Sequence, residues 1–290
     1  MTIAVIGATG NTGRAAVKEL RGLGQNPVCV VRNAGKAREV LGGDAKTAVA
    51  ELTDRPAMEK ALAGVQSVFV VTGHSPSMVE QQNNVLDAAL NAGVRYLVRI
   101  GGARPLAKAD SESPVGLGHA AIEARLKTSG IRWVILSPGA PFMQNLLEQA
   151  ASIRSDNRIV LPAARDLPVA LIDVRDTGAV GARILINPAP HAGRTYELTG
   201  ILTTYGAFAE VLSQVLGRPI AYVSITPEQA EQGMKARNMP DWLVAHLVAT
   251  GKIAAAGAFS TEKTKLIEDL VGRAPITTKQ FVDDFKALFS

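Results

Sequence analysis

Residues 3–14 read IAVIGATGNTGR, a short apolar run that leads directly into a turn with glycine at positions Gly7, Gly10 and Gly13. The run has the continuous apolar character of a strand buried on both faces, and helical periodicity begins at Thr12. Glycine at such a turn permits a tight bend and lets the backbone approach a ligand. The N–H groups and positive end of the following helix attract an anion. This stretch therefore predicts a parallel α/β fold whose first turn holds the pyrophosphate of a dinucleotide.

The alternation of strand and helix continues along the first two-thirds of the chain. Apolar runs at 27–31, 47–50, 67–71, 96–100 and 133–136 predict strands, and amphipathic stretches at 12–23, 57–62, 77–91 and 117–129 predict helices. Strands joined by right-handed helical crossovers form a doubly wound parallel sheet. We therefore expect an α/β fold of the Rossmann type.

The pattern becomes less regular after Pro138. Residues 156–168 suggest a loop or hairpin, 195–199 and 219–223 suggest strands, 202–216 a helix, and the remainder from 227 is mostly helical. We expect a cofactor domain at residues 1–150, to which 169–187 return. Residues 188–290, together with 151–168, then form a smaller, mainly helical C-terminal lobe that binds substrate.

Composition narrows the class of protein. The 290 residues are 47% hydrophobic and 20% charged, as in globular proteins. The net charge of +5 is scattered and only 4% of residues are aromatic, so no nucleic-acid partner is expected. The single cysteine, Cys29, excludes intramolecular disulfides and cysteine metal clusters, and no metal site is expected. No run approaches the ~20 apolar residues of a membrane span, so we expect a cytoplasmic protein with no membrane partner. We further expect a monomer or homodimer that acts on a small-molecule substrate.

The end of the second predicted strand indicates which dinucleotide binds. In NAD-preferring folds a carboxylate about 20 residues after the glycine turn holds the ribose 2′-hydroxyl. Here no carboxylate occurs between Gln25 and Arg38, and Arg32 stands at the strand end. A guanidinium pairs well with phosphate, so Arg32, assisted by Lys36, predicts NADP(H); an ordinary exposed arginine is the alternative. Further contacts are expected from the turn residues Thr9, Asn11 and Thr12.

Small residues follow the next three strands at the same edge of the sheet, where ligands bind in open α/β folds. They leave room for ribose and nicotinamide, although packing alone also selects small residues. We expect cofactor contacts from Thr72, Gly73, Gly101, Gly102, Pro138 and Gly139, and substrate contacts from His74 and Ala103.

These motifs resemble those of the NmrA-like group of atypical short-chain dehydrogenases, which includes quinone oxidoreductases and triphenylmethane-dye reductase. The resemblance covers roughly residues 1–225 and implies an NAD(P)-binding domain with reductase relatives. The motifs that carry it are GATGNTG at 7–13, VVRNAGKA at 30–37, His119-x-x-x-Glu123 followed by SGI at 129–131, LSPG at 136–139, IDVRD at 172–176 and YELTG at 196–200.

One departure from typical short-chain dehydrogenases concerns the proton donor. Their Tyr-x-x-x-Lys pair is absent, because the residues four positions after Tyr96, Tyr196, Tyr205 and Tyr222 are Ile, Gly, Ala and Thr. At the matching place stand His119 and Glu123, on one face of the predicted helix. Alcohol oxidation by the usual route is therefore not expected.

Two interpretations of function remain open. In the first, NADPH reduces an electron-poor acceptor, such as a quinone, conjugated enone, imine or cationic dye. His119 then supplies a proton or hydrogen bond, because imidazole titrates near neutrality, unless it only pins the helix. In the second, the protein is a non-catalytic NADP(H)-binding redox sensor of the NmrA type. A pocket roofed by Phe142, Met143 and Trp242 would favour the enzyme, although Phe142 and Met143 fit a core equally well. His191 and His246 are expected to be structural or exposed.

Overall fold

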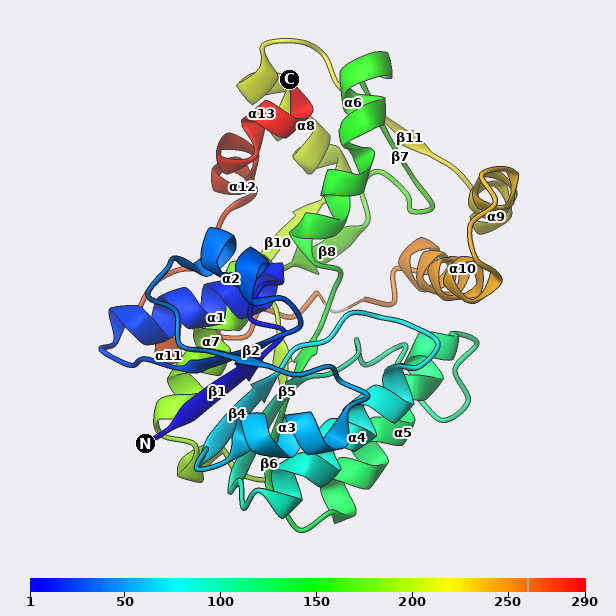
Figure 1. The fold of residues 1–290 in the computed structure, drawn as a ribbon. Helices are drawn as coiled ribbons and strands as arrows, with labels where there is room; N and C mark the ends of the chain where they lie inside the picture. Colours follow the sequence, from blue (N-terminus) through cyan, green and yellow to red (C-terminus); the bar gives the residue numbers. More distant parts are fainter. Residues whose placement is uncertain (260) are drawn as a thin grey trace.

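The structure, a computed structural model, describes residues 1–259 and 261–290 and is built around one parallel sheet (Figure 1). Its strand order is β3-β2-β1-β4-β5-β6-β9. The order reverses between β1 and β4, which creates the crevice where ligands bind in such sheets. The expected doubly wound α/β fold is confirmed. The strands are β1 (Ile3–Ile6), β2 (Val28–Val31), β3 (Thr47–Val49), β4 (Ser67–Val70), β5 (Tyr96–Ile100), β6 (Arg132–Pro138) and β9 (Arg194–Leu198).

Helices cover both faces of the sheet. Residues on β1 alternate, so that Ile3 and Val5 join the core of one face while Ala4 and Ile6 join the other. The first face is covered by α1 (Asn11–Gly22), α2 (Ala34–Leu41), α7 (Val174–Ile186) and α11 (Leu266–Val271). The second is covered by α3 (Arg55–Leu62), α4 (Met78–Asn91) and α5 (Pro114–Thr128).

Two glycines allow α7 to pack directly on α1 and β4. A Cβ at Gly178 would lie 2.6 Å from the carbonyl oxygen of Thr12 in α1, and one at Gly181 would lie 2.6 Å from the ring of Phe69 in β4. The next strand, β9, pairs with β6 and extends the sheet. Residues 194–198, which were expected in the smaller lobe, therefore extend the main sheet. The expected division into two domains stays a prediction.

The remaining elements surround a second core. β7 pairs with β11 and β8 pairs with β10, so residues 156–168 do not form the hairpin that was one of two expectations. The helix expected at 202–216 begins only at Tyr205, after a strand. The elements are η1 (Met143–Gln149), α6 (Ala150–Asp156), β7 (Arg158–Leu161), β8 (Pro168–Leu171), η2 (Ala189–His191), β10 (Ile201–Thr204), α8 (Tyr205–Leu216), β11 (Ala221–Ser224), α9 (Pro227–Ala236), α10 (Asp241–Ala255), α12 (Thr278–Asp284) and α13 (Lys286–Phe289).

Helix α10 packs its last turn against this second core and also lies against α5 (Figure 1). It therefore brings the C-terminal part of the chain next to the carboxyl edge of the sheet. Along the described residues, no helix combines the length and the apolar character needed to cross a bilayer. Cys29 lies in β2 and is 1% exposed, and burial raises the pKa of its thiol.

Candidate functional site

The three glycines of the first turn have different structural roles. Gly7 has a φ of +76°, and a Cβ there would lie 1.9 Å from the carbonyl oxygen of Val71. A Cβ at Gly13 would lie 2.2 Å from the carbonyl oxygen of Gly7. Gly10 is exposed, has an ordinary φ of −77°, and its nearest contact would be 3.3 Å. The fold itself requires Gly7 and Gly13, whereas the absence of a side chain at Gly10 leaves the backbone N–H groups there accessible to a ligand.

The start of α1 has free donors. Its N-cap is Gly10, which provides no side-chain hydrogen bond, and its first turn contains no acidic residue. The amide oxygen of exposed Asn11 accepts from Arg14 Nη2 at 2.7 Å. Thr9 is half-buried and Thr12 is buried. The first N–H groups of a helix with no capping side chain suit an anion, so this turn fits the pyrophosphate of a dinucleotide.

Two cations stand at the end of β2. Arg32 and Lys36 are both exposed, and no residue described in the structure accepts a hydrogen bond from either side chain. Asn33 caps α2 by accepting from the backbone N–H of Lys36 at 3.0 Å. Asn33 thus begins α2, a helix that was not predicted from the sequence. Arg32 and Lys36 both lie close to the first turn of this helix. Their charge is therefore available to a phosphate.

The expected small residues at the other strand ends have packing reasons of their own. A Cβ at Gly101 would lie 2.7 Å from Ile135, and one at Gly102 would lie 2.9 Å from the ring of His119. Pro138 and Gly139 are buried, and the N–H of Gly139 donates to Leu198 of β9. Only Gly73, which is exposed with open space beside it, has no such reason. Thr72 accepts from the Gln82 side chain at 2.8 Å.

A hydrogen-bond network fixes the protonation of His119. Arg99 Nη2 lies 2.9 Å from His119 Nδ1, and Arg99 Nη1 lies 3.4 Å from Glu123 Oε1. A guanidinium only donates, so Nδ1 must accept. The neutral ring then has its proton on Nε2. The prediction that His119 and Glu123 share one helical face is confirmed, since both contact Arg99.

The electrostatics of His119 differ from the expectation. Burial lowers its pKa well below the usual value, and the positive charge of Arg99 and the neighbouring His74 and His246 lower the pKa further. The interpretation that His119 titrates near neutrality was therefore wrong. At pH 7 the ring is neutral and offers an Nε2–H hydrogen bond rather than a readily transferable proton.

Two further imidazoles stand beside His119. The ring of exposed His74 makes edge contacts with those of His119 and His246, at centroid separations of 5.6 and 5.1 Å. His246 comes from α10, and its Nδ1 is 2.8 Å from the hydroxyl of Ser113, the N-cap of α5. Within the described ranges no group of three histidine, cysteine or acidic side chains is arranged to hold a metal. The three imidazoles thus meet edge to edge, and two of them, His119 and His246, are also held by hydrogen bonds.

The expected roof residues are mainly packed. Met143 is fully buried in the second core, and half-buried Phe142 packs on the core of the sheet. Ala103 is half-buried against the second core, and Trp242 packs beside Met78. The structure thus supports the core interpretation for Met143, and it gives Phe142 a packing role as well.

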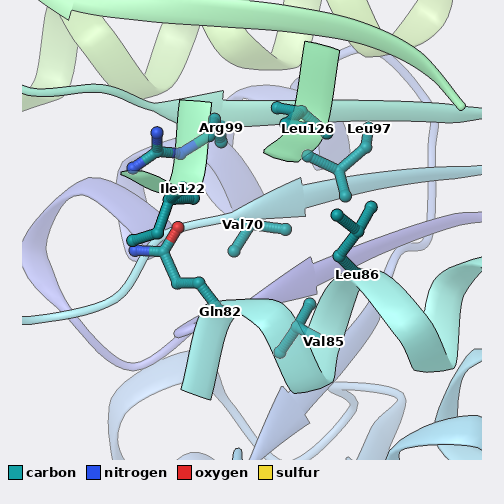
Figure 2. Close-up of a pocket in the computed structure, with 8 residues that line it drawn as sticks. All are labelled: Val70, Gln82, Val85, Leu86, Leu97, Arg99, Ile122 and Leu126. Carbon is teal, nitrogen blue, oxygen red and sulfur yellow. The ribbon is translucent and has the colours of Figure 1, made fainter. Parts of the chain in front are cut away.

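Sequence reasoning missed the buried cation of this site. Arg99 is 1% exposed and lies in the strand YLVRI, where a single charge among apolar residues was the available signal. Its Nε has no hydrogen-bond partner among the described residues. Figure 2 shows Arg99 and Gln82 as polar side chains that line a cavity of about 10 Å³ between β4, β5, α4 and α5. That volume approaches the space of one water molecule.

Together, the parallel sheet and the glycine turn at the start of an uncapped helix define a dinucleotide-binding domain of the Rossmann type. The chain belongs to the NmrA-like family, whose model matches residues 1–274. The resemblance inferred from the sequence is confirmed, and the family contains NAD(P)H-dependent reductases.

Three relatives illustrate this membership. An NAD(P)H azoreductase from Xenophilus azovorans is 36% identical over 244 residues, which cover 83% of each chain. The structure of an NADPH-dependent quinone oxidoreductase from Escherichia coli, complexed with NADPH, matches at 25% identity with a TM-score of 0.85, covering 98% of this chain and 100% of that one. A Citrobacter sp. triphenylmethane reductase complexed with NADP(H) is 22% identical, with a TM-score of 0.82 and coverage of 98% and 99%, and shows the same fold.

Proposed function

We propose that the protein is an NADPH-dependent reductase of electron-poor small molecules, with quinones, conjugated enones, imines and cationic dyes as the candidate acceptors. The observation that carries this proposal is the open glycine turn followed by unpaired Arg32. The turn suits a pyrophosphate, and Arg32 with Lys36 suits the 2′-phosphate that distinguishes NADPH from NADH. When bound there, NADPH supplies a hydride to the acceptor.

The chain's own residues then have separate tasks. Gly7 and Gly13 shape the turn, and the exposed backbone at Gly10 binds the pyrophosphate. Gly73, which is exposed with open space beside it, leaves room at the end of β4, and Gly102 allows the ring of His119 to pack close to the end of β5. The Nε2–H of His119 orients the acceptor, and the arrangement needs no tyrosine–lysine pair because these acceptors require little acid assistance.

The cofactor part of the proposal is tested by measuring the dissociation constants of NADPH and NADH. Arg32→Ala should weaken NADPH binding by roughly 10- to 100-fold, because a hydrogen bond to a charged group contributes about 1.5–3 kcal/mol. NADH binding should hardly change. Arg38→Ala, at an exposed arginine further along α2, is the matched control. Equal affinity of the unmutated protein for both cofactors would remove the role of Arg32.

The reaction is tested by following NADPH oxidation at 340 nm with a panel of quinones, enones, imines and cationic dyes. Turnover with at least one acceptor class is expected, and Gly10→Val, whose side chain would cover the exposed backbone at the start of α1, should abolish it. The second candidate function, a non-catalytic NADP(H) sensor, is favoured by the low pKa of His119, which leaves no ready proton donor at this position. Tight NADPH binding without turnover of any acceptor would support the sensor and contradict the reductase.

A further inference from the structure

A buried positive charge lies next to the proposed acceptor site. Arg99 is 1% exposed, and although burial lowers its pKa to about 10, it remains protonated at neutral pH. Glu123 is the one carboxylate recorded beside it in the described structure, at 3.4 Å. The other oxygen of Glu123 lies 4.0 Å from Lys127 Nζ, so two cations share one carboxylate. The local balance is therefore positive.

The neighbouring histidines do not cancel this charge. His74 follows β4 and His246 comes from α10. Partial desolvation of the His74 ring between its two neighbours lowers its pKa, and burial lowers the pKa of His246 to about 4. Both are therefore neutral at pH 7. His119 accepts from Arg99 through Nδ1, and no partner for its Nε2 is recorded in the part of the chain that the structure describes. Within that part of the chain, the Nε2–H of His119 is therefore the donor of this network that is left for an acceptor.

We propose that Arg99 is a positioning residue that holds His119 as an Nε2–H donor, and that this pair selects acceptors on which negative charge develops over acceptors that are cations. This inference rests on the proposed reductase function and names its substrate class. Quinones belong to the favoured class, and cationic triphenylmethane dyes belong to the disfavoured one.

The preference follows from the charge change of each acceptor. A neutral quinone that takes a hydride from the reduced nicotinamide gains two electrons and one proton, becomes an anion at an oxygen, and then takes a second proton from water. A fixed hydrogen-bond donor aimed at that oxygen stabilises the developing charge. A cationic dye becomes neutral when its central carbon gains the hydride, so it gains nothing from the donor, and the positive surroundings oppose its binding.

The kinetic test compares menadione with malachite green as acceptors. Arg99→Met should lower kcat for menadione by about tenfold, less than the ~100-fold for deleting a preorganised donor, because His119 remains but is no longer held in one tautomer and orientation. The KM for menadione and the dissociation constant of NADPH should change little. Turnover of malachite green should stay level or rise, so the ratio of the two rates should shift by at least roughly tenfold. Arg99→Lys should restore part of the quinone rate.

Arg104→Met is the control, because Arg104 is an exposed cation that lies 4.0 Å from Glu197. It should leave both rates near those of the unmutated protein. Equal losses for the two acceptors in Arg99→Met, or an unchanged ratio, would overturn the proposal. If Arg99→Met does not fold, Arg99→Met combined with Glu123→Gln removes both charges and is subject to the same outcomes.

A second measurement does not depend on turnover. Nitrogen-15 NMR should show His119 as the neutral Nε2–H tautomer at pH 6.5, with and without NADP⁺, and Arg99→Met should give mixed tautomers and a higher pKa. His119→Gln assigns the signal. Protonation of His119 near pH 6.5 in the unmutated protein would overturn the positioning role. If no acceptor is turned over, the reductase proposal and the acceptor preference fail, while this spectrum still decides what Arg99 does to His119.

Discussion

The starts of α1 and α5 lie at the same edge of the sheet, yet they are built in opposite ways. At α1 the N-cap is Gly10, which has no side chain, and the helix donors are left free for a ligand. At α5 the N-cap is Ser113, whose hydroxyl accepts from Gly116 and also contacts His246. The first start is a backbone site and the second is a side-chain network.

This difference teaches where each function can reside. A backbone site depends on the absence of side chains, so it binds a common ligand group such as pyrophosphate. The network at α5 joins His119 and Glu123 of that helix to Arg99 of β5. We expect the network at α5 to determine which acceptor reacts, while the glycine turn at α1 determines which cofactor binds.

The largest effect should come from adding a side chain to the backbone site. Gly7→Ala places a Cβ 1.9 Å from the carbonyl oxygen of Val71 at a residue with positive φ. NADPH affinity should fall by at least roughly 100-fold, and the free energy of unfolding by about 1–3 kcal/mol. Fluorescence titration and thermal unfolding measure both. Gly233→Ala, at an exposed glycine of α9 with open space beside it, should bind NADPH like the unmutated protein. Similar affinity in both variants would mean that NADPH binds elsewhere.

Removing the carboxylate of the network should have the next largest effect. Glu123→Gln keeps the shape of the side chain but leaves Arg99 buried without its recorded counter-charge. We expect a loss of about 3 kcal/mol in the free energy of unfolding, measured in urea at pH 7. Glu112→Gln breaks an exposed pair with Lys252 and should cost no more than about 1 kcal/mol. Equal losses would show that Arg99 does not depend on Glu123.

Acid should weaken the network through His246. Its folded-state pKa is about 4, below the usual 6.5, because of burial and of His74. As pH falls from 6.5 toward 4, the unfolded chain takes up a proton before the folded one, so stability is lost over this range. The free energy of unfolding at pH 7.0, 6.0 and 5.0 should fall less in His246→Asn than in the unmutated protein. Identical slopes would remove His246 from the acid response.

The smallest effect is expected at the cap of α2. Asn33→Ala removes the oxygen that accepts from the Lys36 N–H and should cost about 1 kcal/mol, measured by chemical unfolding. Asn33→Ser should retain most of the stability. Since the cap only positions the segment that holds Arg32, NADPH affinity should change less than in Arg32→Ala. A greater loss of affinity would place Asn33 itself in the site.

The sheet and the glycine turn were predictable because backbone geometry determines both. Apolar runs separated by helical periods specify a parallel sheet, and glycine spacing marks a tight turn. The α2 helix was also predictable, because Asn33 is a typical N-cap residue, but the apolar pattern of this helix is too short to have indicated it.

The network was not predictable in the same way. His119 and Glu123 share a helix face, so their proximity follows from the sequence, whereas Arg99 lies 20 residues before His119 and meets it only through packing of α5 on the sheet. His246 reaches the site from α10, far along the chain. The pKa of His119 depends on these neighbours, and its tautomer depends on Arg99. The sequence therefore predicted the residue and misjudged its protonation.

Because Cys29 is buried, its chemical reactivity can report how often β2 separates from the rest of the sheet. The thiol lies in β2, next to the strand end that leads to Arg32, and its raised pKa keeps it in the unreactive thiol form. An alkylating reagent can reach it only when this part of the sheet separates. The rate at which N-ethylmaleimide labels the single cysteine therefore measures how often β2 separates from its neighbours. Slower labelling with NADPH bound would show that the cofactor stabilises the closed arrangement of these strands.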